Sequence, residues 1–248
     1  MQKNKRLRIF AGPNGSGKST LFKEFKNKYD PGVFINADEL EKQLSSTGFI
    51  DLAEVGLKVS DKELENFKKT KEAKSLLKKA QEEGSIINIE LKDNFIVDKA
   101  KDTHSYEAAF TAAFIRHLLT KDNKSYSFET VMSHLSKLEE IKEANKLGYK
   151  TYLYFVCTDN SEINISRVEN RVEKGGHDVD PEKIKSRYQN TLNNLADAIQ
   201  LVYRAYLFDN SKNLKLIAEV FEGESIQLHK TNLPEWFNIY VLKKFGIE

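Results

Sequence analysis

The chain has 248 residues and a mass of 28.5 kDa, a size that suits one α/β domain with an insertion. Its 39 Lys and Arg against 37 Asp and Glu leave a formal charge of +2, which argues against a whole-protein nucleic-acid footprint. One cysteine excludes an internal disulfide, and no apolar run is long enough for a membrane helix or signal peptide. We therefore expect a cytoplasmic protein with a single domain over 1–248 and no membrane partner.

The first predicted element is a short buried strand over 7–11, and a glycine-rich segment follows it directly. This segment satisfies the pattern G-x-x-x-x-G-K-[ST], and helical spacing continues over 20–25. Glycines allow positive φ and close backbone approach, so that successive N–H groups and a helix N-terminus converge on polyphosphate oxygens. The sequence therefore predicts a nucleoside-triphosphate loop. Its residues are Gly12, Pro13, Asn14, Gly15, Ser16, Gly17, Lys18, Ser19 and Thr20.

Two residues of this loop have predicted chemical roles. Lys18 can reach the β- and γ-phosphates, and the Ser19 hydroxyl can ligate magnesium. Guanine specificity normally requires N-K-x-D at the end of a strand, and none stands there, since the N-K-x-D stretch over 27–30 follows the helical spacing of 20–25. Motor ATPases usually run an apolar strand into Asp-Glu, and the sequence has no such element. These features favour a small-molecule kinase with ATP and Mg²⁺ as cofactors.

Further apolar runs recur at 33–36, 125–128, 149–157 and 205–208, with helical patterns or long connections between them. This alternation predicts an α/β fold with a P-loop NTPase-type parallel sheet flanked by helices. The run at 149–157 is rich in aromatic and β-branched residues, and we place it centrally. The helix before it has an apolar stripe that we expect to pack in the core. Its members are Leu135, Leu138, Ile141 and Leu147.

Residues from about 49 to 104 are predicted to form an insertion. The part from 60 to 81 is rich in lysine and glutamate around a weak apolar stripe, whereas 86–91 and 95–97 are strand pieces around a turn. The pattern predicts a helix plus a hairpin. Because its charges are mixed in sign, a solvated helix face is favoured over a nucleic-acid surface.

The last third of the chain is predicted to hold two helices, a lid and a C-terminal extension. A helix with Ile165 and Val168 on one face ends near two glycines, and Asp180 opens the next helix. The glycine-bearing loop over 174–179 between them is typical of a mobile lid. The extension, from about 212 to 248, is predicted as a peripheral hairpin and a closing amphipathic helix over 234–242.

Carboxylates follow two of the predicted strands, where open α/β sheets bind ligands. Asp38 could take or orient the hydroxyl proton of a phosphoryl acceptor; the alternative is a helix cap within 36–39. Glu129 could bind acceptor hydroxyls, reach the metal through water, or be an ordinary loop carboxylate.

Basic residues of the two helices could complete the site. Phosphoryl transfer mainly needs alignment and cancellation of charge, so Arg167, Arg171 and Arg187 are predicted catalytic residues. The alternative for some of them is pairing with nearby glutamates. His177 in the lid could contact the ligand or pack the loop.

The order of these motifs resembles the zeta-toxin family of bacterial P-loop kinases, in a zeta-toxin-like branch with an insertion after the second strand. The resemblance covers most of residues 6–221. The matching segments are Gly12 to Thr20, Ile35 to Glu39, Ser127 to Thr130, Arg167 to Val172, and Gly175 to Val179 with Arg187 and Tyr188.

This resemblance implies transfer of the ATP γ-phosphate to a hydroxyl of a small acceptor, with UDP-N-acetylglucosamine or a related nucleotide sugar as the candidate. It also implies an antitoxin protein as partner. Asp38 would be the base, and Glu129 and Thr130 would contact the acceptor. Val131 stands where the family motif has a hydroxyl residue, and the acceptor therefore stays open. An alternative class also stays open: a regulatory ATP-binding module whose hydrolysis drives binding of a protein or nucleic acid.

Overall fold

The computed structural model describes residues 5–100, 104–176 and 178–247. The chain divides into two compact units. Residues 1–31 and 127–248 form the first, which we call the loop unit, and residues 32–126 form the second, which we call the insert unit. The single domain over 1–248 stays a prediction. Within the described ranges, none of the helices has both the length and the hydropathy that crossing a bilayer requires.

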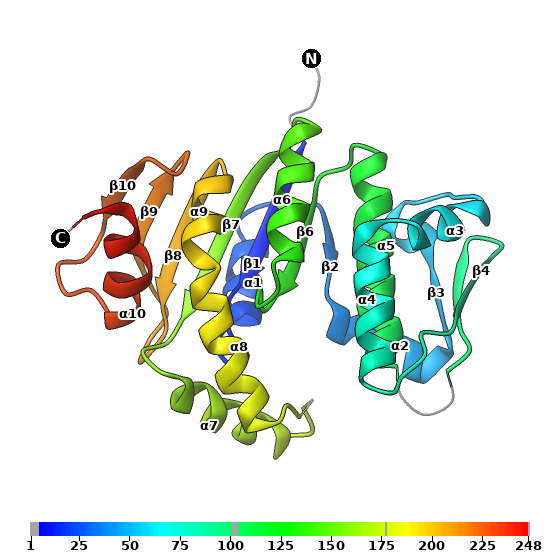
Figure 1. The fold of residues 1–248 in the computed structure, drawn as a ribbon, viewed down its shortest axis with the longest axis horizontal. Coiled ribbons are helices and arrows are strands. Elements are labelled where there is room, and N and C mark those ends of the chain that lie inside the picture. The colour runs from blue at the N-terminus through cyan, green and yellow to red at the C-terminus, as the bar shows by residue number, and fades with distance from the viewer. Residues whose placement is uncertain (1–4, 101–103, 177, 248) are drawn as a thin grey trace. The chain divides into compact units, whose positions relative to one another are not determined.

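A seven-stranded sheet carries the fold (Figure 1). In order across the sheet, its strands are β10 (Ser225–Leu228), β9 (Lys215–Phe221), β8 (Arg204–Asp209), β7 (Lys150–Cys157), β1 (Arg6–Ala11), β6 (Tyr126–Thr130) and β2 (Val33–Ile35). β7 pairs in parallel with β1 and β8, whereas β9 and β10 pair antiparallel at the other edge. This mostly parallel sheet flanked by helices confirms the predicted fold class and the central place of β7.

Apolar side chains fill the space against both faces of the sheet near β1 and β7. Phe10 packs on Phe22 and Phe25 of α1 (Lys18–Lys26), with ring centroids 5.1 and 5.4 Å apart. Phe155 meets Trp236 at 5.8 Å, from the C-terminal segment. Because successive strand residues face opposite sides, β7 alternates between buried and half-buried positions over 150–155.

The remaining helices of the loop unit follow β6, β7 and β10. They are α6 (Ser136–Lys146), α7 (Ser161–Val172), α8 (Pro181–Asn193), α9 (Leu195–Leu201), α10 (Glu235–Phe237), the π-helical turn η2 (Asn238–Leu242) and the 3₁₀ turn η3 (Lys243–Phe245). Asp180 caps α8 as predicted, since its carboxylate accepts a hydrogen bond from the Lys183 N–H at 3.0 Å. The closing helix lies where predicted, but it is irregular after Phe237.

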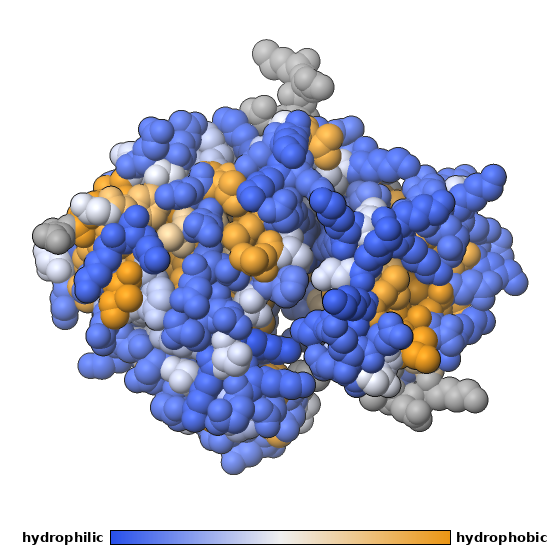
Figure 2. Space-filling model, in the orientation of Figure 1, coloured by the Kyte–Doolittle hydropathy of each residue, from blue (hydrophilic) through white to orange (hydrophobic). Residues whose placement is uncertain are grey.

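The apolar stripe predicted for α6 is right in its middle and wrong at its ends. Leu138 and Ile141 are buried, whereas Leu135 is 61% exposed and Leu147 51% exposed. The reason is that the helix spans only Ser136–Lys146, so the two outer leucines lie beyond it. Figure 2 likewise shows a mainly hydrophilic face interrupted by several separate apolar groups.

The insert unit contains helices and a small antiparallel sheet of its own. Besides β2, its elements are α2 (Ala37–Thr47), β3 (Phe49–Asp51), the 3₁₀ turn η1 (Leu52–Val55), α3 (Lys62–Lys68), α4 (Lys71–Glu82), β4 (Ile89–Lys92), β5 (Phe95–Asp98) and α5 (Ser105–Lys121). β5 pairs with both β3 and β4. Phe67 of α3 packs on Phe110 and Phe114 of α5, with ring centroids 5.2 and 5.3 Å apart. This aromatic cluster lies in the core of the unit.

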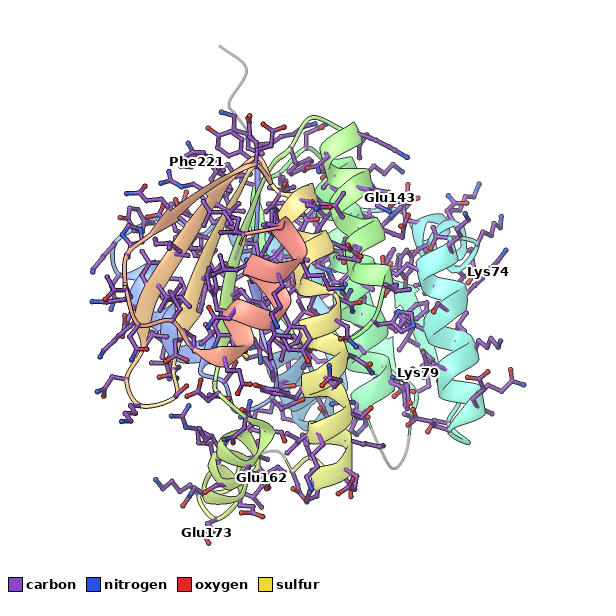
Figure 3. The ribbon with its side chains drawn as sticks, turned by 60° about the vertical axis from the view of Figure 1, so that its left-hand side comes forward. Lys74, Lys79, Glu143, Glu162, Glu173 and Phe221 are labelled. Atoms are coloured by element: carbon purple, nitrogen blue, oxygen red, sulfur yellow. The ribbon has the colours of Figure 1, made fainter. Side chains whose placement is uncertain are left out.

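The insert unit contains more helices and strands than the predicted helix plus hairpin. The single helix expected over 60–81 is divided at Thr70, whose hydroxyl accepts a hydrogen bond from the Ala73 N–H at 3.2 Å and so starts α4. The first strand begins at Ile89 rather than Ile86, which is 83% exposed. β3 and α5 were not predicted. Lys74 projects outward from α4, as expected for a solvated face (Figure 3).

Candidate functional site: the phosphate-binding loop

The segment between β1 and α1 adopts a conformation that depends on its glycines. Gly12, Gly15 and Gly17 have φ values of +147°, +73° and +106°. A Cβ atom at Gly15 would lie 2.6 Å from the Asn164 carbonyl oxygen, and one at Gly12 would overlap the Val156 carbonyl oxygen. Side chains at these positions would therefore force the loop to move.

The loop leads into a helix whose first turn has no acidic side chain. Gly17 is the N-cap of α1, without a side-chain cap. The partial positive charge of the helix N-terminus is thus left for a ligand. Backbone hydrogen bonds fix the loop between β1 and α1. The Gly12 N–H donates to the Thr130 carbonyl oxygen at 3.3 Å, and the Ser16 N–H donates to the Pro13 carbonyl oxygen at 3.3 Å. This loop and helix start have the geometry expected of an anion cradle.

Lys18 and Ser19 point to different partners around this cradle. Lys18 Nζ donates to the Pro13 carbonyl oxygen at 2.9 Å, which keeps the ammonium group along the loop. Ser19 Oγ donates to Glu129 Oε2 at 3.0 Å. The structure therefore brings together the predicted metal ligand and a carboxylate from the end of β6.

This pair of oxygen donors has the chemistry that Mg²⁺ prefers. Mg²⁺ usually keeps several waters and binds through one or two protein oxygens plus substrate phosphates. Across the described ranges, no group of three or more His, Cys, Asp and Glu side chains could hold a metal ion. Ser19 and Glu129 thus fit a metal that enters together with a polyphosphate, rather than a metal held in a protein cage.

The segment after Glu129 is fixed by hydrogen bonds from several elements. Thr130 Oγ1 accepts a hydrogen bond from the Met132 N–H at 3.1 Å, and Met132 has a φ of +61°. Thr191 Oγ1 donates to the Val131 carbonyl oxygen at 2.8 Å, and Asn194 Nδ2 donates to that of Met132 at 3.0 Å. These bonds fix the backbone that presents Glu129. Thr130, the predicted acceptor-binding residue, also accepts a hydrogen bond within this local turn, and its acceptor role stays a prediction.

Two asparagines that the sequence analysis did not single out contact the loop. Asn164 of α7 donates to the Asn14 carbonyl oxygen, and Asn210, directly after β8, donates to the Ser16 carbonyl oxygen at 2.8 Å. A sequence signal existed for Asn210, because it follows a strand at the edge where ligands bind. Asn164 lies beside the apolar stripe of α7 and gave no such signal.

The three predicted arginines lie in different environments. Arg167 is half-buried and donates through Nη2 to the Ser211 carbonyl oxygen at 3.4 Å, next to Asn210. Its Nη1 is buried and lacks a hydrogen-bond partner among the described atoms. Arg171 is exposed at the end of α7, and Arg187 is half-buried on α8. A hydrogen bond thus connects Arg167 to the residue that follows Asn210.

The predicted base belongs to the other unit of the chain. Asp38 lies in the insert unit, exposed in the first turn of α2. Asn36 is the cap of that helix, since its Oδ1 accepts a hydrogen bond from the Asp38 N–H at 2.9 Å. The Asp38 carboxylate is therefore not the capping group. His177 falls outside the described residues.

Comparison with known proteins gives weak sequence matches and clear structural ones. No family model matches the chain. An uncharacterised protein of Haemophilus influenzae is 28% identical over 82 residues, which are 33% of this chain and 59% of that protein. The sequence match thus covers less than two thirds of the relative.

Solved structures match over nearly the whole chain. A chain of the AvrRxo1-ORF1:AvrRxo1-ORF2 complex with sulphate ions aligns with a TM-score of 0.58 and 14% identity, covering 98% of this chain and 64% of that one. A chain from the PezAT chromosomal toxin–antitoxin system of Streptococcus pneumoniae aligns with a TM-score of 0.52 and 14% identity, covering 100% and 80%. These matches confirm the predicted fold class, a mostly parallel sheet flanked by helices, and at 14% identity they show the fold alone.

Proposed function

We propose that this protein is a magnesium-dependent phosphotransferase that moves the γ-phosphate of ATP to a hydroxyl group of a small acceptor. The observation that carries the proposal is the Ser19–Glu129 hydrogen bond of 3.0 Å beside the glycine loop and Lys18. A hydroxyl, a carboxylate and an ammonium group at one phosphate cradle are the donor-side parts that phosphoryl transfer needs.

Each residue has a defined task in this reaction. The loop N–H groups and Lys18 bind the β- and γ-phosphates. Ser19 and Glu129 would hold a magnesium ion, which would supply positive charge against the phosphate oxygens. The acceptor oxygen bonds to the γ-phosphorus while the bond to the bridging oxygen breaks, and ADP leaves. Arg167 stabilises the negative charge of the transferring group.

Asp38 is proposed as the base that takes the proton of the acceptor hydroxyl. Its support is its residue type, its exposed place in the first turn of α2, and the match of 35–39 to the family motif. If Asp38 is the base, Asp38→Ala should bind ATP like the wild type and lose acceptor phosphorylation. Near-normal turnover by this variant would contradict the assignment.

A nucleotide amino sugar of the UDP-N-acetylglucosamine type is the proposed acceptor. The support is the motif order shared with zeta toxins. The experiment is a screen of ATP consumption against nucleotide sugars, free sugars and nucleosides, with product masses measured. One acceptor should gain about 80 Da, the mass of one transferred phosphoryl group, with wild-type protein and not with Lys18→Ala. If no compound gains this mass, the proposed function fails.

We also propose that a small antitoxin protein binds this chain and restrains it. The support is that structures with this fold include a toxin–antitoxin system and a two-protein complex. Expression of the wild-type protein alone should slow bacterial growth, whereas Lys18→Ala should not. Equal growth of both strains at equal protein levels would contradict the toxin proposal.

A further inference from the structure

The phosphate loop is held by two amide side chains from outside the loop. Asn164 Nδ2 donates to the Asn14 carbonyl oxygen, and Asn210 Nδ2 donates to the Ser16 carbonyl oxygen at 2.8 Å. The two acceptors are two residues apart in the loop. Both donors belong to the loop unit, one from α7 and one from the turn after β8.

Each of these bonds fixes the direction of an N–H group. In a trans peptide, the carbonyl of one residue and the N–H of the next lie in one plane and point in opposite directions. A bond that holds the Asn14 carbonyl therefore aims the Gly15 N–H the other way, and the bond to the Ser16 carbonyl does the same for the Gly17 N–H. Phosphate cradles are built from such successive N–H groups.

Both asparagines are themselves held in place, Asn164 through its side chain and Asn210 through its backbone. Asn164 is fully buried, and its Oδ1 accepts a hydrogen bond from Thr158 Oγ1. Thr158 is also buried, and its carbonyl oxygen accepts a hydrogen bond from the Tyr188 hydroxyl at 2.7 Å. The backbone N–H of Asn210 donates to the Cys157 carbonyl oxygen at 2.8 Å. The Asn164 amide is thus anchored to the residue after β7, and the backbone of Asn210 is anchored to the last residue of β7.

The loop glycines match these asparagines sterically. A Cβ atom at Gly15 would lie 2.6 Å from the Asn164 carbonyl oxygen, and a Cβ at Gly17 would overlap the Asn210 side-chain nitrogen. The close approach of each asparagine therefore requires glycine at the position whose N–H it orients. Loop and asparagines are fitted to each other at both places.

We propose that Asn164 and Asn210 are positioning residues, which aim the N–H groups of Gly15 and Gly17 at the phosphates of the bound nucleotide. This rests on the proposed function only in taking a polyphosphate as the ligand. The asparagines act through the loop backbone and need not touch the nucleotide. Their loss should weaken polyphosphate binding without unfolding the protein.

The test uses Asn164→Asp and Asn210→Asp, which keep the side-chain size and replace the amide donor by an oxygen. Asn170→Asp is the matched control, because Asn170 is exposed on the same α7 and donates only to the Ser166 carbonyl oxygen of its own helix at 2.7 Å. Calorimetric titration measures Kd for ATP, ADP and inorganic pyrophosphate. Thermal melting of each variant reports on the fold.

Each of the two variants should bind all three ligands about tenfold more weakly, the effect of losing one well-placed hydrogen bond, while Asn170→Asp matches the wild type. Equal weakening of pyrophosphate and ATP is the readout that a general loss of packing would not give. If Asn164→Asp fails to fold, Asn210→Ala at its half-buried position tests the same claim.

The proposal would be overturned if folded Asn210→Asp and Asn210→Ala bound the three ligands with Kd values within twofold of the wild type. Weaker ATP binding with unchanged pyrophosphate binding would also overturn it, because the effect would then lie away from the phosphates. Failure of the proposed function is a separate result, namely tight ATP binding by the wild type without phosphorylation of any acceptor.

Discussion

The two units of the chain use buried polar side chains for different purposes. In the loop unit, buried Asn164 and the half-buried Asn210 bond to the backbone of the phosphate loop. In the insert unit, Glu107 is 2% exposed and accepts a hydrogen bond from the Asn88 N–H at 3.2 Å. There the bond fixes the unit's own backbone.

This difference predicts which substitutions should change ligand affinity and which should change the free energy of unfolding. Buried polar groups must be hydrogen-bonded wherever they lie. Asn164 and Asn210 of the loop unit bond to the segment that we propose binds phosphates, whereas Glu107 of the insert unit bonds to the segment before β4. Substitutions in the loop unit should therefore change ligand affinity, whereas those in the insert unit should change the free energy of unfolding.

The largest expected effect is on the core of the insert unit. Phe67→Ala removes a fully buried ring that contacts two other phenylalanines, and it should lower the free energy of unfolding by about 3–5 kcal/mol. Urea unfolding measures this loss. The Kd for ATP of the folded protein should stay at its wild-type value. A large change in that Kd would break the proposed separation between the units.

Lys18→Ala should have the largest effect on chemistry. Removing the ammonium group from the phosphates should lower the rate of acceptor phosphorylation by about 10²–10³-fold, as with other charge-stabilising donors. The free energy of unfolding should change little, because Lys18 is only half-buried. ADP formation and urea unfolding measured on one preparation check both statements. Wild-type activity in Lys18→Ala would contradict a catalytic role for the loop.

Two glycine substitutions, one in each unit, test whether crowding around the loop makes its glycines harder to replace. Gly12→Ala would place a Cβ onto the Val156 carbonyl oxygen, so it should lower the free energy of unfolding by about 2–4 kcal/mol. It should also abolish ATP binding, because the loop would have to move. Gly84→Ala in the insert unit also has positive φ, +75°, but its Cβ would meet open space, so it should cost only about 1 kcal/mol. Urea unfolding and ATP titration of both variants test this, and equal costs would contradict the steric argument.

The smallest expected effect is a pH dependence in the insert unit. Burial raises the pKa of Glu107 above its ordinary value of 4.5, so this group's contribution to stability is fully present below about pH 4.5 and is lost as the pH rises through the raised value. Glu107→Gln keeps the acceptor for Asn88 and removes the titration. The variant should therefore gain stability relative to the wild type as the pH rises.

Urea unfolding at a series of pH values measures this gain. The control is Glu143→Gln, at an exposed position on α6 (Figure 3), which should follow the wild type at every pH. A constant difference between Glu107→Gln and the wild type across the series would show that burial does not perturb this carboxyl group.

Local sequence patterns predicted the elements with strong signals. The loop over 12–20 was predicted because its residue types are dictated by phosphate binding, and β7 because its aromatic and β-branched run suits a central strand. The cap at Asp180 was predicted for the same local reason. Each of these features depends on residues close together in the chain.

What the sequence did not reveal depends on distant residues. α5 lacks a clear polar face, because tertiary packing buries it nearly all round. Leu135 and Leu147 fit an apolar stripe by spacing, yet the helix ends before them. The bonds from Asn164 to Asn14 and from Asn210 to Ser16 span 150 and 194 residues, and spacing rules do not reach that far.

The most direct test of the central claim is a calorimetric titration of the wild-type protein with ATP, in Mg²⁺ and in EDTA. The account predicts saturable binding at one site, tighter in Mg²⁺, with the difference between the two conditions reduced in Glu129→Gln. Absence of saturable ATP binding in both conditions would contradict the claim that the loop and the Ser19–Glu129 pair form the donor site of a kinase.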